Sequence, residues 1–347
     1  MAHQSLYRTY RPRTFNEVEE QPQVTQPLIE QVKEGKIGHA YLFAGSRGLG
    51  KTSVARIFAR AVGCTEKDLY EIDAASHNSV EDIRTLTEGV YTLPFESPYK
   101  VYILDEVHML SKAAWNAFLK TLEEPPAHAI FILATTELEK VPETVRSRCQ
   151  VFEFKKPSRA ALAQLVARVA KKEKYKLDPD AAELVALLAD GSYRDALSVL
   201  ERVLASASGT TLSRAVVETV TGAPKRELVH GLIAALAEGS RGAALVAIER
   251  TAKSGADMQL FLMLVIESLR ATLLLRYAPD LHKALAAELG KDEYETLSRY
   301  AKSETKPGVT HATLLAFLNA VERIRFSPVP SVPLELAVFE LMGSEDA

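Results

Sequence analysis

"HAYLFAGSRGLGKTSVARIFARAV", residues 39–62, decides the fold because it joins three local patterns without a break. Residues 39–44 form an apolar run that predicts a buried β-strand, and residues 53–62 have the pattern of a helix. Between them, residues 45–52 match G-x-x-x-x-G-K-[ST] at every fixed position. Strand, glycine-rich loop and helix in this order predict a phosphate-binding loop.

The residues of this loop have distinct expected roles. Its backbone N–H groups can turn inward around phosphate oxygens, and the following helix adds its positive N-terminal end. Lys51 can reach the β- and γ-phosphates of a nucleotide, and Thr52 can bind Mg²⁺. The alternative, a glycine turn beside a chance lysine, does not explain the complete match. The expected nucleotide contacts are Gly45, Ser46, Arg47, Gly48, Leu49, Gly50, Lys51, Thr52 and Ser53.

Two adjacent carboxylates follow a later apolar run. Residues 101–105 predict another strand, and Asp105-Glu106 stands at its carboxyl end. At that edge of a parallel sheet, Asp105 can hold the magnesium ion, and Glu106 can orient or deprotonate a water that attacks the γ-phosphate. An isolated Asp-Glu pair would more often be a charge at a helix N-terminus. Behind a phosphate-binding loop, the pair favours nucleotide hydrolysis.

The alternation of apolar runs and helical patterns predicts an α/β fold with a parallel sheet in the first half of the chain. Nearly continuous apolar runs are typical of strands buried on both faces. After Pro157 helix signals take over, and Gly222-Ala223-Pro224 interrupts them, so we place domain boundaries near 157 and 222. The expected strands are 39–44, 69–73, 101–105, 129–134 and 150–154.

Composition limits the class of protein. The chain has 347 residues, of which 47% are hydrophobic and 25% charged, and a net charge of −3. These values predict a globular protein of two or three domains. Any nucleic-acid contact must therefore be local. The N-terminus has no export-signal pattern, and the apolar stretch 257–278 contains Asp257, Glu267 and Arg270. We expect no membrane association, a cytoplasmic location, and packing of that stretch inside a helical bundle or against a partner.

Several motifs together resemble the AAA+ clamp-loader ATPases, and within them the gamma/tau family of bacterial DNA polymerase III. The resemblance implies a RecA-like AAA+ ATPase domain at 1–157, a helical lid at 158–222 and a helical collar at 223–347 that holds several subunits together. It is strong over about 1–205 and rests only on position and helical character beyond 222. The motifs are the phosphate-binding loop, YRTYRPRTFNEV (7–18), EIDAAS (71–76), LDEVHMLSKAAWNAFLKTLEEPP (104–126), LATT (133–136), SRC (147–149) and GSYRDALS (191–198).

The resemblance also assigns residues around the nucleotide, which it implies is ATP with Mg²⁺. Thr135 or Thr136 would be the first sensor, which hydrogen-bonds the γ-phosphate or the attacking water. Arg194 would be the second sensor, which reaches the nucleotide from the lid; its alternative is a surface ion pair. The segment against adenine would supply Tyr7, Arg8, Arg11, Pro12 and Val18.

The resemblance gives Arg148 a role outside its own subunit. In relatives the arginine of Ser-Arg-Cys is presented to the ATP of the neighbouring subunit, so Arg148 resembles an arginine finger that acts in trans. Such a residue is worth about 10³–10⁵ in rate, roughly 4–7 kcal/mol. Neighbouring Cys149 has no base and no orienting partner in the sequence, so we expect an inert thiol.

The chain departs from the family at two places. Relatives carry a four-cysteine zinc module after the P-loop helix, whereas Cys64 here leads directly to the second strand, so no zinc is expected. The family's Val-Gly-Gln is replaced by Glu19-Glu20-Gln21. For DNA contact, the candidates are Arg84, Lys112 and the amides of a helix that begins near Val80, with Ser79 and Asp82 in a capping box.

Together these patterns predict an ATP-driven clamp-loader motor subunit that opens the sliding clamp and loads it onto primer-template DNA. The expected partners are further copies of the chain, delta-type clamp-loader subunits, the clamp and DNA. Two alternatives stay open: a non-hydrolysing scaffold subunit that only supplies Arg148, and another AAA+ DNA motor such as a branch-migration helicase. No residue pattern indicates a polymerase site, so the predicted enzyme activity is Mg²⁺-dependent ATP hydrolysis.

Overall fold

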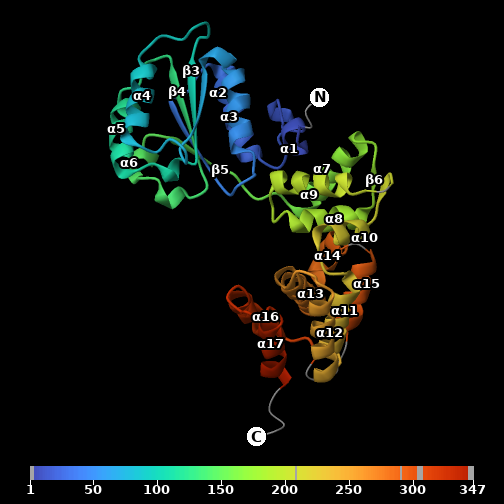
Figure 1. The fold of residues 1–347 in the computed structure, drawn as a ribbon. Helices are drawn as coiled ribbons and strands as arrows, with labels where there is room; N and C mark the ends of the chain where they lie inside the picture. Colours follow the sequence, from blue (N-terminus) through green and yellow to red (C-terminus); the bar gives the residue numbers. More distant parts are fainter. Residues whose placement is uncertain (1–3, 208, 290, 303–307, 343–347) are drawn as a thin grey trace. The chain divides into compact units, whose positions relative to one another are not determined.

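The computed structural model describes residues 4–207, 209–289, 291–302 and 308–342 (Figure 1). The ends of the predicted first and third domains, 1–3 and 343–347, therefore lie outside the described residues. The chain forms two compact units: residues 1–173 with 185–201, and residues 174–184 with 202–347. The helices of 158–222 are shared between these units, and the boundaries near 157 and 222 stay predictions.

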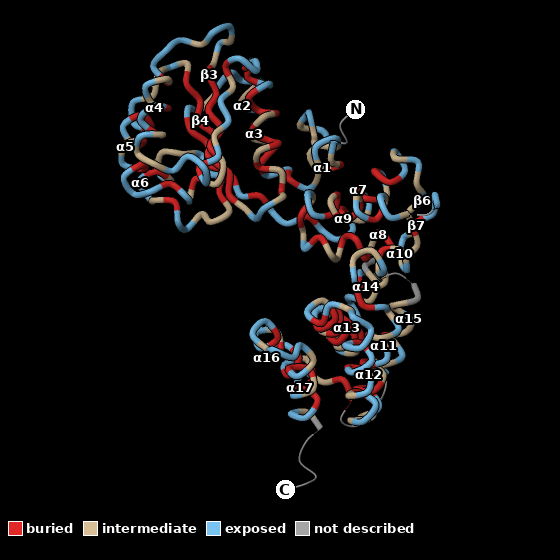
Figure 2. The backbone as a smooth tube through the Cα atoms, in the orientation of Figure 1, coloured by how far each residue is buried: buried red, intermediate tan, exposed pale blue. Residues whose placement is uncertain are grey.

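A five-stranded sheet in the order β2-β3-β4-β1-β5 organises the first unit. Every pairing is parallel, as the apolar runs predict. All residues of β1 and β4 are buried, since helices cover both faces (Figure 2). Each of the five expected strands is confirmed to within one residue: Ala40–Ala44, Leu69–Asp73, Lys100–Asp105, Ala129–Thr135 and Gln150–Glu153.

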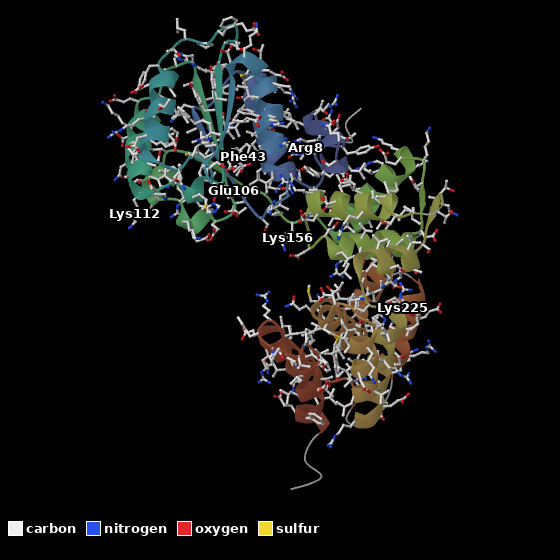
Figure 3. The ribbon with its side chains drawn as sticks, viewed as in Figure 1. Arg8, Phe43, Glu106, Lys112, Lys156 and Lys225 are labelled. Atoms are coloured by element: carbon white, nitrogen blue, oxygen red, sulfur yellow. The ribbon has the colours of Figure 1, made fainter. Side chains whose placement is uncertain are left out.

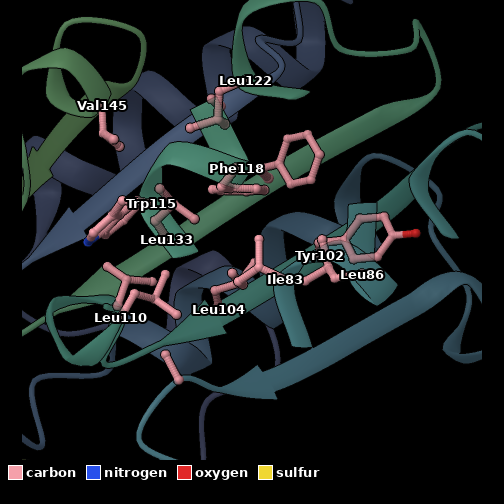
Figure 4. Packing of buried hydrophobic residues seen from close by; sticks show 14 of the residues in the cluster. Ile83, Leu86, Tyr102, Leu104, Leu110, Trp115, Phe118, Leu122, Leu133 and Val145 are labelled. Carbon is pink, nitrogen blue, oxygen red and sulfur yellow. The ribbon is translucent and has the colours of Figure 1, made fainter. Parts of the chain in front are cut away.

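Alternate residues of the strands feed two hydrophobic clusters. On one face, Leu104 and Phe131 pack under α4 (Val80–Val90) and α5 (Lys112–Glu123), and Phe118 meets Phe131 edge to face at 5.2 Å. Figure 4 shows Leu104, Phe118 and Leu122 of this cluster. On the other face, Tyr41 and Phe43 pack with α2 (Pro22–Glu34) and α3 (Lys51–Ala61). This alternation is the two-residue period of a strand with both faces covered.

Helix caps appear where the sequence predicts them. Ser79 and Asp82 form a complete capping box at the start of α4, and the Ser158 side chain caps α7. The remaining helices of the first unit are α1 (Leu6–Thr9), α6 (Glu143–Arg146), α7 (Arg159–Lys172) and the start of α9 (Tyr193–Ala205).

The second unit is helical except for one short parallel pair, β6 with β7, which the sequence analysis missed. Its helix α13 is long and apolar enough to cross a membrane, but 56% of its most apolar 18-residue stretch is buried inside the protein. It packs against α11, α15 and α16, as expected for a helix inside a bundle. The elements are β6 (Lys176–Leu177), the first part of α8 (Pro179–Leu188, whose residues from 185 on belong to the first unit), the end of α9, β7 (Thr211–Leu212), α10 (Arg214–Thr221), α11 (Arg226–Ala237), α12 (Arg241–Lys253), α13 (Met258–Tyr277), α14 (His282–Leu289), α15 (Lys291–Ala301), α16 (His311–Ile324) and α17 (Val332–Met342).

Buried Asp68 fixes the loop that joins α4 to β3. Its carboxylate accepts backbone N–H bonds from Phe95 at 2.5 Å, Glu96 at 3.0 Å and Ser97 at 2.9 Å. Burial by itself raises the pKa of Asp68, but these N–H donors outweigh it and lower the pKa to about 2. The loop is therefore held in one shape although the Leu93 and Phe95 side chains are exposed.

This carboxylate should make stability depend on pH. The pKa of Asp68 is about 2 in the folded protein, below the unfolded value of about 3.9. Its stabilisation is therefore complete above about pH 4 and is lost as the pH falls toward 2. Over that range, the unfolding free energy of the wild type should fall by about 2 kcal/mol more than that of Asp68→Asn. Denaturant titrations at several pH values measure this difference, and equal pH slopes would contradict it.

Candidate active site

The phosphate-binding loop connects β1 to α3, whose N-cap is Gly50. Gly45 and Gly48 have φ values of +144° and +78°, in a region that side chains rarely adopt. A Cβ atom on Gly45 would lie 2.8 Å from the Phe154 carbonyl oxygen, and one on Gly48 would lie 2.0 Å from the Ser192 hydroxyl. Both positions therefore require glycine, and the close approach at Gly48 packs the loop against the residue before α9.

The other loop residues face different ways. Ser46 and Arg47 are exposed, and Leu49 is buried in the cluster under α3. The Lys51 ammonium donates to the carbonyl oxygens of Gly45 at 2.7 Å and Ser46 at 3.0 Å. These bonds hold the ammonium against the loop whose N–H groups would surround a phosphate.

Charge surrounds Lys51 as well. Burial lowers the pKa of Lys51, whereas Glu106 and Asp105 act in the opposite direction. A buried ammonium next to two carboxylates is the electrostatic arrangement that suits a bound phosphate and its cation.

Thr52 and Asp105 come together at the carboxyl edge of the sheet. The Thr52 hydroxyl donates to Asp105 Oδ2 at 2.7 Å, so the two predicted metal ligands lie side by side. Hydroxyl and carboxylate oxygens suit Mg²⁺, which is commonly held by one or two protein groups together with substrate phosphates and waters. Among the described residues, no group of three or more His, Cys, Asp or Glu side chains could hold a metal by itself.

Glu106 has an unusual backbone for a residue other than glycine, with φ of +51°. Its N–H donates to Asp105 Oδ1 at 3.0 Å, and its carboxylate accepts a hydrogen bond from the Thr136 hydroxyl at 3.1 Å. Thr135 is fully buried, and its hydroxyl oxygen accepts the N–H of Glu137. Of the two sensor candidates, the structure therefore brings Thr136 to Glu106 (Figure 3 labels Glu106).

The N-terminal segment and α3 enclose a cavity of about 160 Å³. Arg11 donates from Nε to the Ser53 hydroxyl at 2.9 Å. Burial first, and then the neighbouring Arg56, lower the pKa of Arg11. Arg13, Arg56 and Arg60 were not predicted as site residues, although Arg56 and Arg60 are one helical turn apart. The lining residues are Arg8, Arg11, Pro12, Arg13, Ser53, Arg56 and Arg60.

The other expected members of the adenine segment lie elsewhere. The Tyr7 ring stacks with the Arg194 guanidinium at 5.5 Å, and Arg194 is exposed. Val18 packs against the core cluster under α3 instead of lining the cavity. The Ser192 hydroxyl accepts the N–H of Asp195 at 3.2 Å and so caps α9 beside the loop.

Arg148 is bound within its own subunit. Its guanidinium donates to Glu123 Oε1 at 2.5 Å and to the Thr144 carbonyl at 2.6 Å, and 34% of its side chain is exposed. Burial raises the pKa of the adjacent Cys149 thiol to about 12, and that of Cys64 to about 11. Such thiols carry little thiolate at neutral pH, which agrees with the inert role expected for Cys149.

The candidate DNA contacts lie at the starts of two helices. Ser79 caps α4 and Ser111 caps α5, and the Ser111 N–H reaches the Asn78 carbonyl at 3.4 Å. Arg84 and Lys112 are exposed on these helices (Figure 3 labels Lys112).

Replacing Gly48 should lower nucleotide affinity more than replacing a glycine that has open space around it. Gly48→Ala places a methyl group against Ser192 at a strained φ, so we expect nucleotide affinity to fall by at least about tenfold. Equilibrium binding of a fluorescent ATP analogue measures this loss. Gly242→Ala in α12, where an added Cβ atom meets nothing within 4 Å, is the matched glycine control, and equal affinities of the two variants would contradict the packing argument.

Three family models match successive parts of the chain. Residues 20–78 and 66–158 match the family described as DNA polymerase III, delta subunit. Residues 161–209 match the ATPase lid domain of the DNA polymerase III clamp loader subunit, and residues 212–347 match domain III of the gamma and tau subunits.

Solved structures support the fold. The RuvB Holliday junction branch migration motor of Thermotoga maritima is 19% identical, with a TM-score of 0.54 over 92% of this chain and 99% of that one. At this identity the likeness concerns the fold alone. It agrees with the RecA-like AAA+ architecture predicted from the sequence.

Whole-chain relatives carry the family assignment. DNA polymerase III subunit tau of Bacillus subtilis is 36% identical over 98% of this chain, which spans 63% of that protein. The gamma/tau subunit of Mycobacterium tuberculosis is 34% identical over 97% of this chain, which spans 62% of it. The gamma subunit of Buchnera aphidicola is 31% identical over 98% of both chains. The chain therefore belongs to the DNA polymerase III gamma/tau family of clamp-loader subunits.

Proposed function

We propose that this chain is the ATP-driven motor subunit of a clamp loader, which opens a sliding clamp and loads it onto primer-template DNA in the cytoplasm. One observation carries the proposal: Thr52 with Asp105, and Glu106 with Thr136, form two paired contacts at the same sheet edge beside Lys51. A subunit that only held its neighbours together would not need these groups in register, which weighs against the scaffold alternative.

The geometry supports ATP hydrolysis by these residues. The loop N–H groups and Lys51 would bind the β- and γ-phosphates. When bound, Mg²⁺ would neutralise charge on the phosphate oxygens, and Thr52 and Asp105 are the residues that would hold it. Glu106 would accept the proton of the attacking water or orient it, and Thr136 would fix the Glu106 carboxylate.

The base and ribose of ATP would lie on the side of the loop near the arginine-lined cavity. Its guanidinium planes can stack on a purine and donate to ribose oxygens. Arg194 would reach the nucleotide from the start of α9. When ATP binds, its guanidinium would leave the Tyr7 ring and contact the nucleotide instead.

Arg148 would complete the ATP site of the next subunit. Its ion pair with Glu123 is partly exposed, and such pairs contribute about 0–1 kcal/mol. An arginine finger contributes roughly 4–7 kcal/mol to the transition state. Because the second contribution is larger, Arg148 would leave Glu123 and contact the phosphates of ATP bound to the neighbouring subunit. Assembly of the subunits would therefore switch ATP hydrolysis on.

The helical second unit supports assembly with other clamp-loader subunits, both copies of this chain and delta-type chains. Its helices α16 and α17 and the turn between them expose a set of large apolar side chains that a monomer would not need to display. They are Leu315, Leu318, Phe326, Val329, Val332, Leu336 and Phe339.

A clamp-stimulated ATPase assay tests the proposed function. ATP hydrolysis by the assembled subunits should rise at least about tenfold when clamp and primed DNA are both present, because both would complete the active spiral. A branch-migration helicase would hydrolyse ATP without regard to the clamp. Absence of ATP binding in equilibrium dialysis would instead support the scaffold alternative.

The trans role of Arg148 predicts complementation between two inactive variants. Arg148→Ala should bind ATP normally yet lose about 10³-fold in hydrolysis, whereas Lys51→Ala should lose ATP binding but keep its arginine finger. Mixing the two should restore activity at each Arg148→Ala site that faces a Lys51→Ala neighbour. Arg250→Ala, on an exposed residue of α12, is the charge-matched control. Mixed assemblies that stay inactive would argue against a role in trans.

A further inference from the structure

His108 lies directly behind the carboxylate proposed to activate water. It belongs to the short 3-10 helix η3 (Val107–Met109), and only 8% of its side chain is exposed. Its Nδ1 atom is 3.1 Å from the Thr135 hydroxyl oxygen and 3.5 Å from Glu106 Oε2. Its Nε2 atom is 3.2 Å from Glu137 Oε1. Nδ1 therefore faces both Thr135 and Glu106, and Nε2 faces Glu137.

We infer that His108 is a positioning residue that holds the Glu106 carboxylate for attack on ATP. The inference rests on the proposed hydrolysis of ATP and adds a residue to which no role has been assigned. His108 does not need to touch the nucleotide: it acts through Glu106 and through its own contacts with Thr135 and Glu137.

Glu106 needs such support because little else fixes it. Its backbone is in the left-handed region, which costs about 1–3 kcal/mol for a residue other than glycine and persists only where surrounding contacts hold it. Its side chain has several rotatable bonds and is 31% exposed. Thr136 contacts only one carboxylate oxygen, Oε2, and His108 approaches that same oxygen from the ring side. The hydrogen bond from Thr136 together with the ring nitrogen at 3.5 Å restricts this oxygen more than the hydrogen bond alone.

His108 is itself well anchored. Glu137 holds its Nε2 atom, and the Glu137 N–H donates to the Thr135 hydroxyl at 3.0 Å. Lys140 pairs with the second oxygen of Glu137 at 2.6 Å. The ring is therefore tied to the end of β4 and to the following turn. A misplacement of the Glu106 carboxylate by about 1 Å would cost on the order of 10²-fold in rate, so the approach of Nδ1 to Glu106 bears directly on hydrolysis.

Two isosteric variants separate the contacts of the two ring nitrogens. In His108→Asn the side-chain amide can replace Nδ1 and still face Glu106. In His108→Gln the amide reaches toward the place of Nε2 and faces Glu137. If positioning of Glu106 is the role, kcat of the assembled ATPase should stay within about threefold of wild type in His108→Asn. It should fall about 10–100-fold in His108→Gln and His108→Ala, with the nucleotide Kd within about twofold in all three variants.

A double-mutant cycle completes the test. In a Glu106→Gln background, His108→Ala should lower kcat no further, since the positioned carboxylate is already gone. His128→Ala is the matched control: its ring contacts the Val90 carbonyl in the same unit, and kcat should be unchanged. Equal kcat for wild type and His108→Ala, equal loss of kcat in His108→Asn and His108→Gln, or an undiminished loss in the Glu106→Gln background would each overturn the inference. A wild-type assembly that does not hydrolyse ATP would instead contradict the proposed function.

Discussion

The parallel register of the sheet is the constraint on which the site depends. Ala44 at the end of β1 pairs with Thr135 at the end of β4, and β4 in turn pairs with β3, which ends at Asp105. Because parallel strands end at the same edge, the phosphate-binding loop, the carboxylates and the threonines meet there although they are far apart in sequence. A slip of one residue would turn these side chains to the opposite face.

Much of this arrangement could be predicted because it rests on short-range patterns. The apolar runs that gave the five strands are long and continuous, and the phosphate-binding loop has a fixed spacing. The capping box of Ser79 and Asp82 is equally local, and the structure contains it. The short β6 and β7 escaped prediction because two residues cannot establish a period.

The remaining features depend on tertiary contacts that a sequence does not display. Thr135 and Thr136 are chemically identical, and only the burial of one and the contact of the other with Glu106 distinguish them. Val18 is apolar and packs against the core cluster, so its position in the motif did not predict its surroundings. His108 stands in the quoted motif, but the sequence does not show that its ring contacts Thr135 and Glu137, which are about 30 residues away.

The exposed apolar side chains of α16 and α17 have a consequence for temperature. Near room temperature the burial of apolar surface is driven by the entropy of the surrounding water, and this driving force weakens on cooling. If a second subunit covers Leu315, Leu336 and Phe339, as we propose, association would carry a negative heat capacity change. An assembly held in this way would loosen in the cold, before the individual subunits lose their own folded cores.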